Sequence, residues 1–219
     1  MENKELNSQN PQEATDLIAK LQANRKKIIT AGCALAAAII VGLAWYYISE
    51  SNSNKAAEAA GEADYAMFVE GNDSVAVELY KKAAEMGYDS GSRANVMLAI
   101  SAYQKGNYEE ALTYLENASM DDEVIASGVC SLKGDCLVNL QKLDEALEAY
   151  DEAISTANGN PLTAGLFLVK KANIYREKGE FAKEYEAYKT IFDRYPEFTT
   201  STQVDLQKYL ERAKAAAGK

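Results

Sequence analysis

GNYEEALTYLENAS, at residues 106–119, occurs in altered form three more times along the chain. The other copies are GNDSVAVELYKKAAE at residues 71–85, QKLDEALEAYDEAI at 141–154 and GEFAKEYEAYKTIF at 179–192. They begin at Gly71, Gly106, Gln141 and Gly179, so the copies are evenly spaced except for a slightly longer last interval. A period of about 35 residues is typical of a solenoid built from small helical units.

Small and large residues recur inside the copies. Five residues after the first position of each copy stand Ala76, Ala111, Ala146 and Glu184. Four residues further on stand the large residues Tyr80, Leu115, Tyr150 and Tyr188. Three residues after those come Ala83, Ala118, Ala153 and Ile191. A small residue lets two helices cross closely, and a large neighbour fills the remaining space. We therefore expect each unit to be a helix pair that turns at the first position, with Glu184 as a departure from the pattern.

This pattern resembles the tetratricopeptide repeat over residues 56–198. Gly134 and Pro196 match the glycine of the first helix and the terminal proline of that repeat, whereas Asp64, Ala99 and Ala172 stand where the same glycine is expected. The resemblance implies an all-α, right-handed α-solenoid of about four helix pairs. Residues 200–217 carry one apolar stripe and should form a capping helix, which makes nine helices in total.

An uncharged segment precedes the repeats at residues 28–48. At about 1.5 Å per residue these 21 residues span roughly 31 Å, the thickness of a bilayer core. The eight Ile, Leu and Val side chains favour insertion by about 2.5 to 5 kcal/mol, and no charge opposes them. We predict a transmembrane helix at 28–48, after a cytoplasmic segment at 1–27 and before a linker at 49–55 and a repeat domain at 56–219.

Two other interpretations of the segment are disfavoured. Residues 30–33, TAGC, are similar to a lipoprotein processing site, but a lipidated cysteine should close the apolar run, whereas Cys33 comes only five residues into it. A removable export signal would have a shorter apolar core followed by small residues, whereas Trp45, Tyr46 and Tyr47 end this one. Arg25, Lys26 and Lys27 precede the helix, so the amino terminus should stay in the cytoplasm and the repeats should be exported.

Two features of the amino-terminal part suggest contacts. A stripe of small residues on the membrane helix could pack against a second helix; it comprises Ala31, Ala34, Ala38 and Gly42. Ala14, Leu17, Ile18 and Leu21 have the spacing of a short amphipathic helix before the anchor.

Composition narrows the function. The chain carries 23 Lys and Arg against 33 Asp and Glu, and its acidic excess lies in the repeats, so nucleic acid is a poor partner. There is no histidine and no phosphate-loop or nucleophile-elbow motif, and we expect no catalysis, metal, cofactor or small-molecule substrate. Cys130 and Cys136 point apart on a helix and are expected to be small buried thiols.

The first helix of each pair lines the concave surface of such solenoids. By register, the expected partner-binding groove includes Tyr65, Phe68, Val96, Ile100, Tyr103, Asp135, Val138, Asn173 and Arg176. Its apolar and aromatic start and polar end suit an extended polypeptide or a helix. The alternative is that Tyr65, Phe68 and Tyr103 pack against neighbouring helices.

The whole layout resembles the ancillary subunit of the bacterial Sec translocon, in its Bacteroidetes-type form. The resemblance rests on GNYEEA at 106–111, LKGDC at 132–136, LDEA at 143–146 and DLQKYLERA at 205–213, together with the single anchor and the acidic repeats. It implies a chaperone-like adaptor in the inner membrane, with translocon subunits, a periplasmic peptidyl-prolyl isomerase or secretory proteins as partners. A scaffold for another cell-envelope complex and an organellar import receptor remain as alternatives.

Overall fold

The computed structural model describes Thr15 and residues 19–219, and within those residues it contains helices and no strand. It divides into two compact units, residues 1–52 and 53–219, which are described separately. The expected amphipathic helix before the anchor falls largely outside the described residues.

Helix α2 (Arg25–Phe68) contains the predicted anchor. The side chains between Ile28 and Ile48 are exposed, and the helix is long and apolar enough to cross a membrane. The chain differs from the prediction at residues 49–55, which are helical and lie inside α2 instead of forming a linker. No proline or turn glycine interrupts this stretch, so its polar side chains are accommodated on the helix surface.

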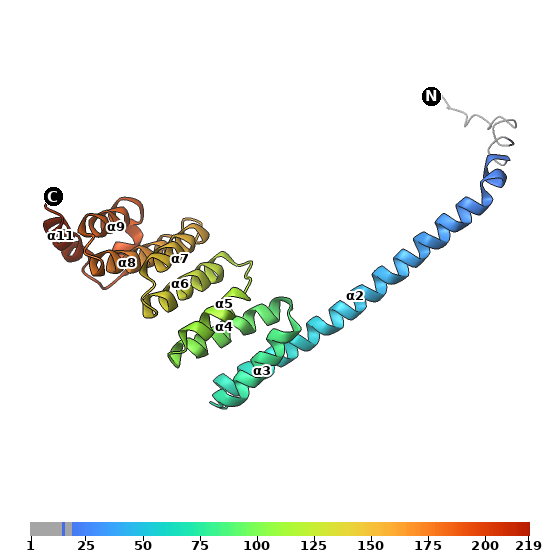
Figure 1. The fold of residues 1–219 in the computed structure, drawn as a ribbon, viewed down its shortest axis with the longest axis horizontal. Coiled ribbons are helices and arrows are strands. Elements are labelled where there is room, and N and C mark those ends of the chain that lie inside the picture. Colours follow the sequence, from blue (N-terminus) through green and yellow to red (C-terminus); the bar gives the residue numbers. More distant parts are fainter. Residues whose placement is uncertain (1–14, 16–18) are drawn as a thin grey trace, which may run out of the picture. The chain divides into compact units, whose positions relative to one another are not determined.

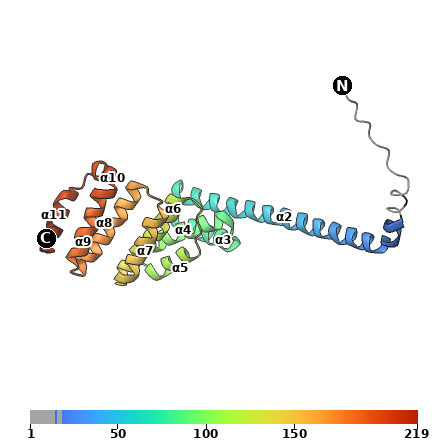
Figure 2. The same ribbon diagram turned by 90° about the horizontal axis from the view of Figure 1, so that it is seen from above.

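The second unit is the predicted α-solenoid. Figures 1 and 2 show its helices following one another from α3 to α11. The pairs are residues 56–68 of α2 with α3 (Asp73–Met86), α4 (Tyr88–Gln104) with α5 (Tyr108–Glu116), α6 (Glu123–Asn139) with α7 (Leu143–Thr156), and α8 (Pro161–Glu177) with α9 (Phe181–Arg194). The longer interval before the last pair is taken up by the loop before α8, where the Asn160 side chain caps the helix.

The turn residue of each repeat, at the position predicted for the turn, has a left-handed backbone conformation. Gly71, Gly106 and Gly179 have φ values of 65°, 80° and 74°, and Gln141 adopts 61° without being glycine. Just beyond the helix end, backbone N–H groups bond back to the last turn, as in the bond from Asn107 to the Ala102 carbonyl at 2.9 Å. This closure reverses the chain within a short turn.

The repeated small and large residues form the core. Ala76, Ala111 and Ala146 have no exposed surface, and Tyr80, Leu115, Tyr150 and Tyr188 are all at most 4% exposed. The core is therefore a series of alanine contacts closed by one large side chain in each repeat.

Two helices complete the solenoid. The predicted cap is α11 (Leu206–Ala216), which buries Leu206 and Ala213. The short helix α10 (Pro196–Ser201) was not predicted; its Phe198 ring lies so close to Gly165 that an added Cβ there would stand 2.4 Å from it. Glycine in α8 thus makes room for a helix that the repeat pattern does not specify.

Candidate interaction surface

The predicted groove residues of α2 and α4 are apolar or aromatic, and they differ in exposure. Tyr65, Phe68 and Val69 are 57%, 70% and 67% exposed at the end of α2, which is high for large apolar side chains. Val96, Ile100 and Tyr103 on α4 are half-buried. The Tyr103 ring packs edge-on against Tyr108, with centroids 5.4 Å apart. Tyr65 and Phe68 are thus available to a partner, while Tyr103 is partly occupied by a neighbouring helix.

Asp64 joins the first three helices of the solenoid. Its carboxylate accepts a hydrogen bond of 2.5 Å from the Tyr80 hydroxyl on α3. The same carboxylate forms an ion pair of 2.5 Å with Arg93 on α4. Burial alone would raise the pKa of Asp64, but the bonds from Arg93 and Tyr80 outweigh burial and lower it. Burial and the bond to Asp64 raise the pKa of Tyr80.

The same arrangement recurs at Asp135, which was expected to line the groove. This carboxylate accepts a 2.6 Å bond from the Tyr150 hydroxyl on α7, and Lys170 on α8 approaches it to 2.6 Å. Lys170 also donates to the Ser131 hydroxyl at 2.9 Å. Asp135 therefore connects three helices, and its oxygens are already engaged. An aspartate in the first helix with a tyrosine in the second helix of the same repeat was the signal that could have identified both networks.

The remaining predicted residues lie toward the C-terminal end of the face. Val138 is half-buried, while Asn173 and Arg176 lie on α8 and are both exposed. Asn139 reaches the Tyr103 hydroxyl at 3.4 Å, which brings α6 and α4 together on this side. The structure thus places the polar part of the predicted face on α6 and α8, as its register implies.

Sequence reasoning missed four apolar side chains at the start of α6 and α8. They are Val124, Ile125, Leu162 and Leu166, and each is between 45% and 54% exposed. The hydrogen bonds from Asn158 to Glu123 tie the start of α6 to the loop before α8. Because Val124 and Leu162 each follow the first residue of their helix, they occupy the same repeat position, and this equivalence could have identified them.

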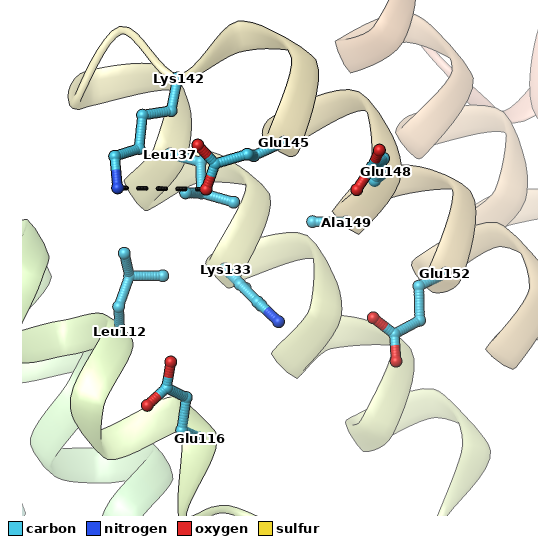
Figure 3. A pocket seen from close by; sticks show the side chains of 9 residues that line it. All are labelled: Leu112, Glu116, Lys133, Leu137, Lys142, Glu145, Glu148, Ala149 and Glu152. Carbon is cyan, nitrogen blue, oxygen red and sulfur yellow. Dashed lines mark ion pairs between the residues drawn. The ribbon is translucent and has the colours of Figure 1, made fainter.

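Clefts recur between the helices at equivalent repeat positions. In the middle one, lined by α5, α6 and α7, Figure 3 shows Lys133 with Glu145, which pairs with Lys142, and with three other glutamates. Those glutamates are Glu116, Glu148 and Glu152. At the equivalent place between α8 and α9, Lys171 forms an ion pair with Asp151 on α7. A third cleft, lined by α3, α4 and α5, is mostly uncharged.

The small residues of the anchor and the cysteines have different surroundings. Ala31, Ala34, Ala38 and Gly42 are exposed on α2, and nothing lies within 4 Å of a Cβ added at Gly42. Cys136 is fully buried and Cys130 half-buried, as expected for packed thiols. Burial raises the pKa of Cys136 to about 11, so this thiol is unreactive at neutral pH. Among the described residues, no group of three acidic, cysteine or histidine side chains could hold a metal ion.

Comparison with known proteins supports the repeat fold. The tetratricopeptide repeat-like domain family matches residues 68–174, from the end of α2 into α8. Two crystal structures of MamA share the fold: one has a TM-score of 0.56 at 18% identity and covers 71% of this chain and 84% of that chain. The other has a TM-score of 0.57 at 16% identity, with 77% and 84% covered. None of the curated proteins compared with the chain matches it.

These matches show the fold of the chain and indicate the role that this fold usually has. A tetratricopeptide repeat-like domain is typically a scaffold for protein–protein interaction without catalysis, because stacked helix pairs present one long continuous surface. The fourth pair, α8 with α9, extends the solenoid beyond the matched residues.

Proposed function

We propose that this chain is a single-pass adaptor of the bacterial inner membrane that holds protein partners beside the Sec translocon. The exposed apolar side chains at Tyr65 and Phe68 carry the proposal, because such residues cost solubility unless something covers them. They lie in a repeat fold whose usual role is protein binding, on a chain with a helix able to cross a membrane. The resemblance to the ancillary Sec subunit adds the export role.

Orientation follows from the charges beside the anchor. Three basic residues precede the apolar segment, so the amino terminus stays in the cytoplasm and the solenoid is exported to the periplasm. The helix surface formed by Ala31, Ala34, Ala38 and Gly42 would contact a membrane helix of the translocon. Its small side chains permit close approach between two helix backbones.

The proposal is tested by photo-crosslinking in living cells. An aromatic photo-crosslinking amino acid replaces Tyr65 or Tyr103 in the full chain, and Phe181, 38% exposed on a second helix, serves as the matched control. Mass spectrometry should identify translocon subunits, a periplasmic isomerase or secretory chains at Tyr65 and Tyr103 but not at Phe181.

Two results would contradict the proposal. Capture at Tyr65 of a fixed set of envelope proteins, unchanged when secretion is blocked, would favour a scaffold for cell-wall or outer-membrane assembly. Equal capture at all three positions would mean that the first helices are not a specific binding surface.

A further inference from the structure

The apolar side chains of the first helices form a diagonal band. On α2 and α4 they stand near the C-terminal ends, at Phe68 and Tyr103, whereas on α6 and α8 they stand near the N-terminal ends, at Val124 and Leu162. Side chains four or seven positions apart lie on the same face of a helix. The ion pair from Arg93 to Asp64 holds α4 beside α2, and the ion pair from Lys170 to Asp135 holds α8 beside α6. The band therefore crosses the face from one edge to the other.

Acidic residues occupy the corner on one side of this band. Glu58 and Glu62 lie on α2 and Asp89 lies in the first turn of α4, and all three are exposed. They form no ion pair within the part of the chain that the structure describes. Arg93, the basic residue nearest to them on α4, is bound to Asp64. Lys55, exposed on α2 three residues before Glu58, offsets one of the three carboxylates, so this corner keeps a net negative charge.

The opposite corner has no comparable excess. It is built from Asn139, Asn173 and Arg176, and Glu177 follows Arg176 on α8. One positive and one negative side chain balance each other, and the two amides can both donate and accept hydrogen bonds. The face is thus acidic on one side of the apolar band and neutral on the other.

We propose that the occupant of this face is an amphipathic helix of a partner protein with Lys or Arg residues along one flank only. The inference rests on the proposed function and specifies the chemistry of the partner. A helix presents an apolar stripe with a separate side-chain flank on each side, which matches a band bordered by acid on one side. An extended strand directs its side chains above and below and has backbone at its flanks, so it would leave the acidic corner without partners.

Two synthetic helices test the charge. Both are about five helical turns long and have the same leucine face. One carries lysines along one flank, and its twin carries glutamates at the same positions. Binding to the full chain in nanodiscs of zwitterionic lipid is measured by fluorescence anisotropy, with empty nanodiscs subtracted. The lysine helix should bind about ten-fold more tightly at low salt, since each exposed pair contributes little and three add together. High salt should reduce this ratio toward one.

Variants of exposed residues locate the binding. The substitutions Glu58→Lys, Glu62→Lys and Asp89→Lys reverse the charge of the acidic corner and should make the glutamate helix the tighter ligand. Phe68→Ser with Leu162→Ser should weaken both helices by about ten-fold or more, because two apolar contacts are lost. The matched control, Val75→Ser with Val204→Ser, changes two exposed apolar residues elsewhere and should change neither affinity.

The proposal fails if neither helix binds, if the twins bind equally, or if reversing the corner leaves the preference unchanged. These failures are separate from failure of the proposed function. Crosslinking at Tyr65 would still capture export partners if the adaptor role is right and only the charge of the ligand is wrong.

Discussion

At Glu184 the fourth repeat departs from the alanine that the other three have, and the reason is a residue outside the repeat. The Glu184 carboxylate is 1% exposed and accepts a hydrogen bond of 2.6 Å from Arg212 on α11. Next to it, Tyr188 stacks on Tyr209 with ring centroids 6.0 Å apart. In the last pair, a charged bond to Arg212 of the cap replaces the close alanine crossing.

Removing Arg212 should therefore loosen the cap. Arg212→Ala leaves a buried carboxylate without its partner and should destabilise α9 and α11 by about 2 to 3 kcal/mol, at the low end for buried pairs because the arginine is partly exposed. Adding Glu184→Ala removes the orphaned charge and should restore part of the loss. Hydrogen exchange of the α9 and α11 amides measures both; equal protection in the single and double variants would contradict the pairing.

Two glycines of α6 offer a second residue-level comparison. A Cβ at Gly134 would stand 2.5 Å from the Tyr150 ring, whereas nothing lies within 4 Å of one at Gly128. Gly134→Ala should cost about 1 to 3 kcal/mol by displacing Tyr150 from Asp135. Gly128→Ala should stabilise the helix by about 0.5 to 1 kcal/mol. Urea unfolding of the full chain distinguishes them, and two equal effects would refute the close contact.

Between elements, the solenoid is held by aspartates that each connect three helices. Asp64 bonds to α3 and α4, and Asp135 bonds to α7 and α8. In the second repeat the corresponding second-helix residue is Leu115, which is buried without a hydroxyl. The helix order is thus set by alanine packing in the first three repeats and reinforced by hydrogen bonds in the first and third.

Acid should weaken the first of these connections. The pKa of Asp64 is lower in the folded chain than its unfolded value of about 3.9, so its contribution is complete above that pH and is lost as pH falls through the folded pKa. The melting temperature of the wild type should therefore exceed that of Asp64→Asn at pH 6, with a difference that shrinks below about pH 4.

Tyr80→Phe is the matched variant for this measurement. It removes one of the bonds that lower the pKa of Asp64 in the folded chain, so the acid-dependent loss of stability should be smaller than in the wild type and complete at a higher pH. A wild-type advantage over Asp64→Asn that stays constant from pH 6 to pH 3 would show that the carboxylate charge contributes nothing.

On the scale of the whole molecule, the apolar segment and the repeats have surfaces that suit different solvents. Residues 28–48 have exposed apolar side chains that suit lipid, whereas the second unit carries an acidic surface that suits water. Under the proposed function, the apolar segment lies in the membrane and the second unit is exported.

Thiol labelling of intact cells tests that orientation. Native Cys136 is buried with a raised pKa, and burial also raises the pKa of the half-buried Cys130, so both should label poorly. Asp121→Cys adds an exposed thiol in the turn before α6. A maleimide that cannot cross the inner membrane should label Asp121→Cys in intact cells. Labelling only after lysis would place the solenoid in the cytosol.

The sequence by itself determined the class of fold, the number of helix pairs and the apolar segment. The turn positions at Gly71, Gly106, Gln141 and Gly179 and the buried positions around Tyr80 and Tyr150 could all be predicted, because each repeat folds by local spacing and packs only on its neighbours. The alternation of small and large residues is likewise a one-dimensional pattern. The groove residues were predicted by register, and their role stays a prediction.

Only the tertiary structure decided which polar groups are free. It paired Asp135 with Lys170 and Glu184 with Arg212, placed Phe198 over Gly165, and left Val124 and Leu162 exposed. These contacts join side chains far apart in the sequence through the stacking of helices, so they depend on which groups meet in space and not on any local period. Those contacts between helices determine the charge and shape of the candidate surface.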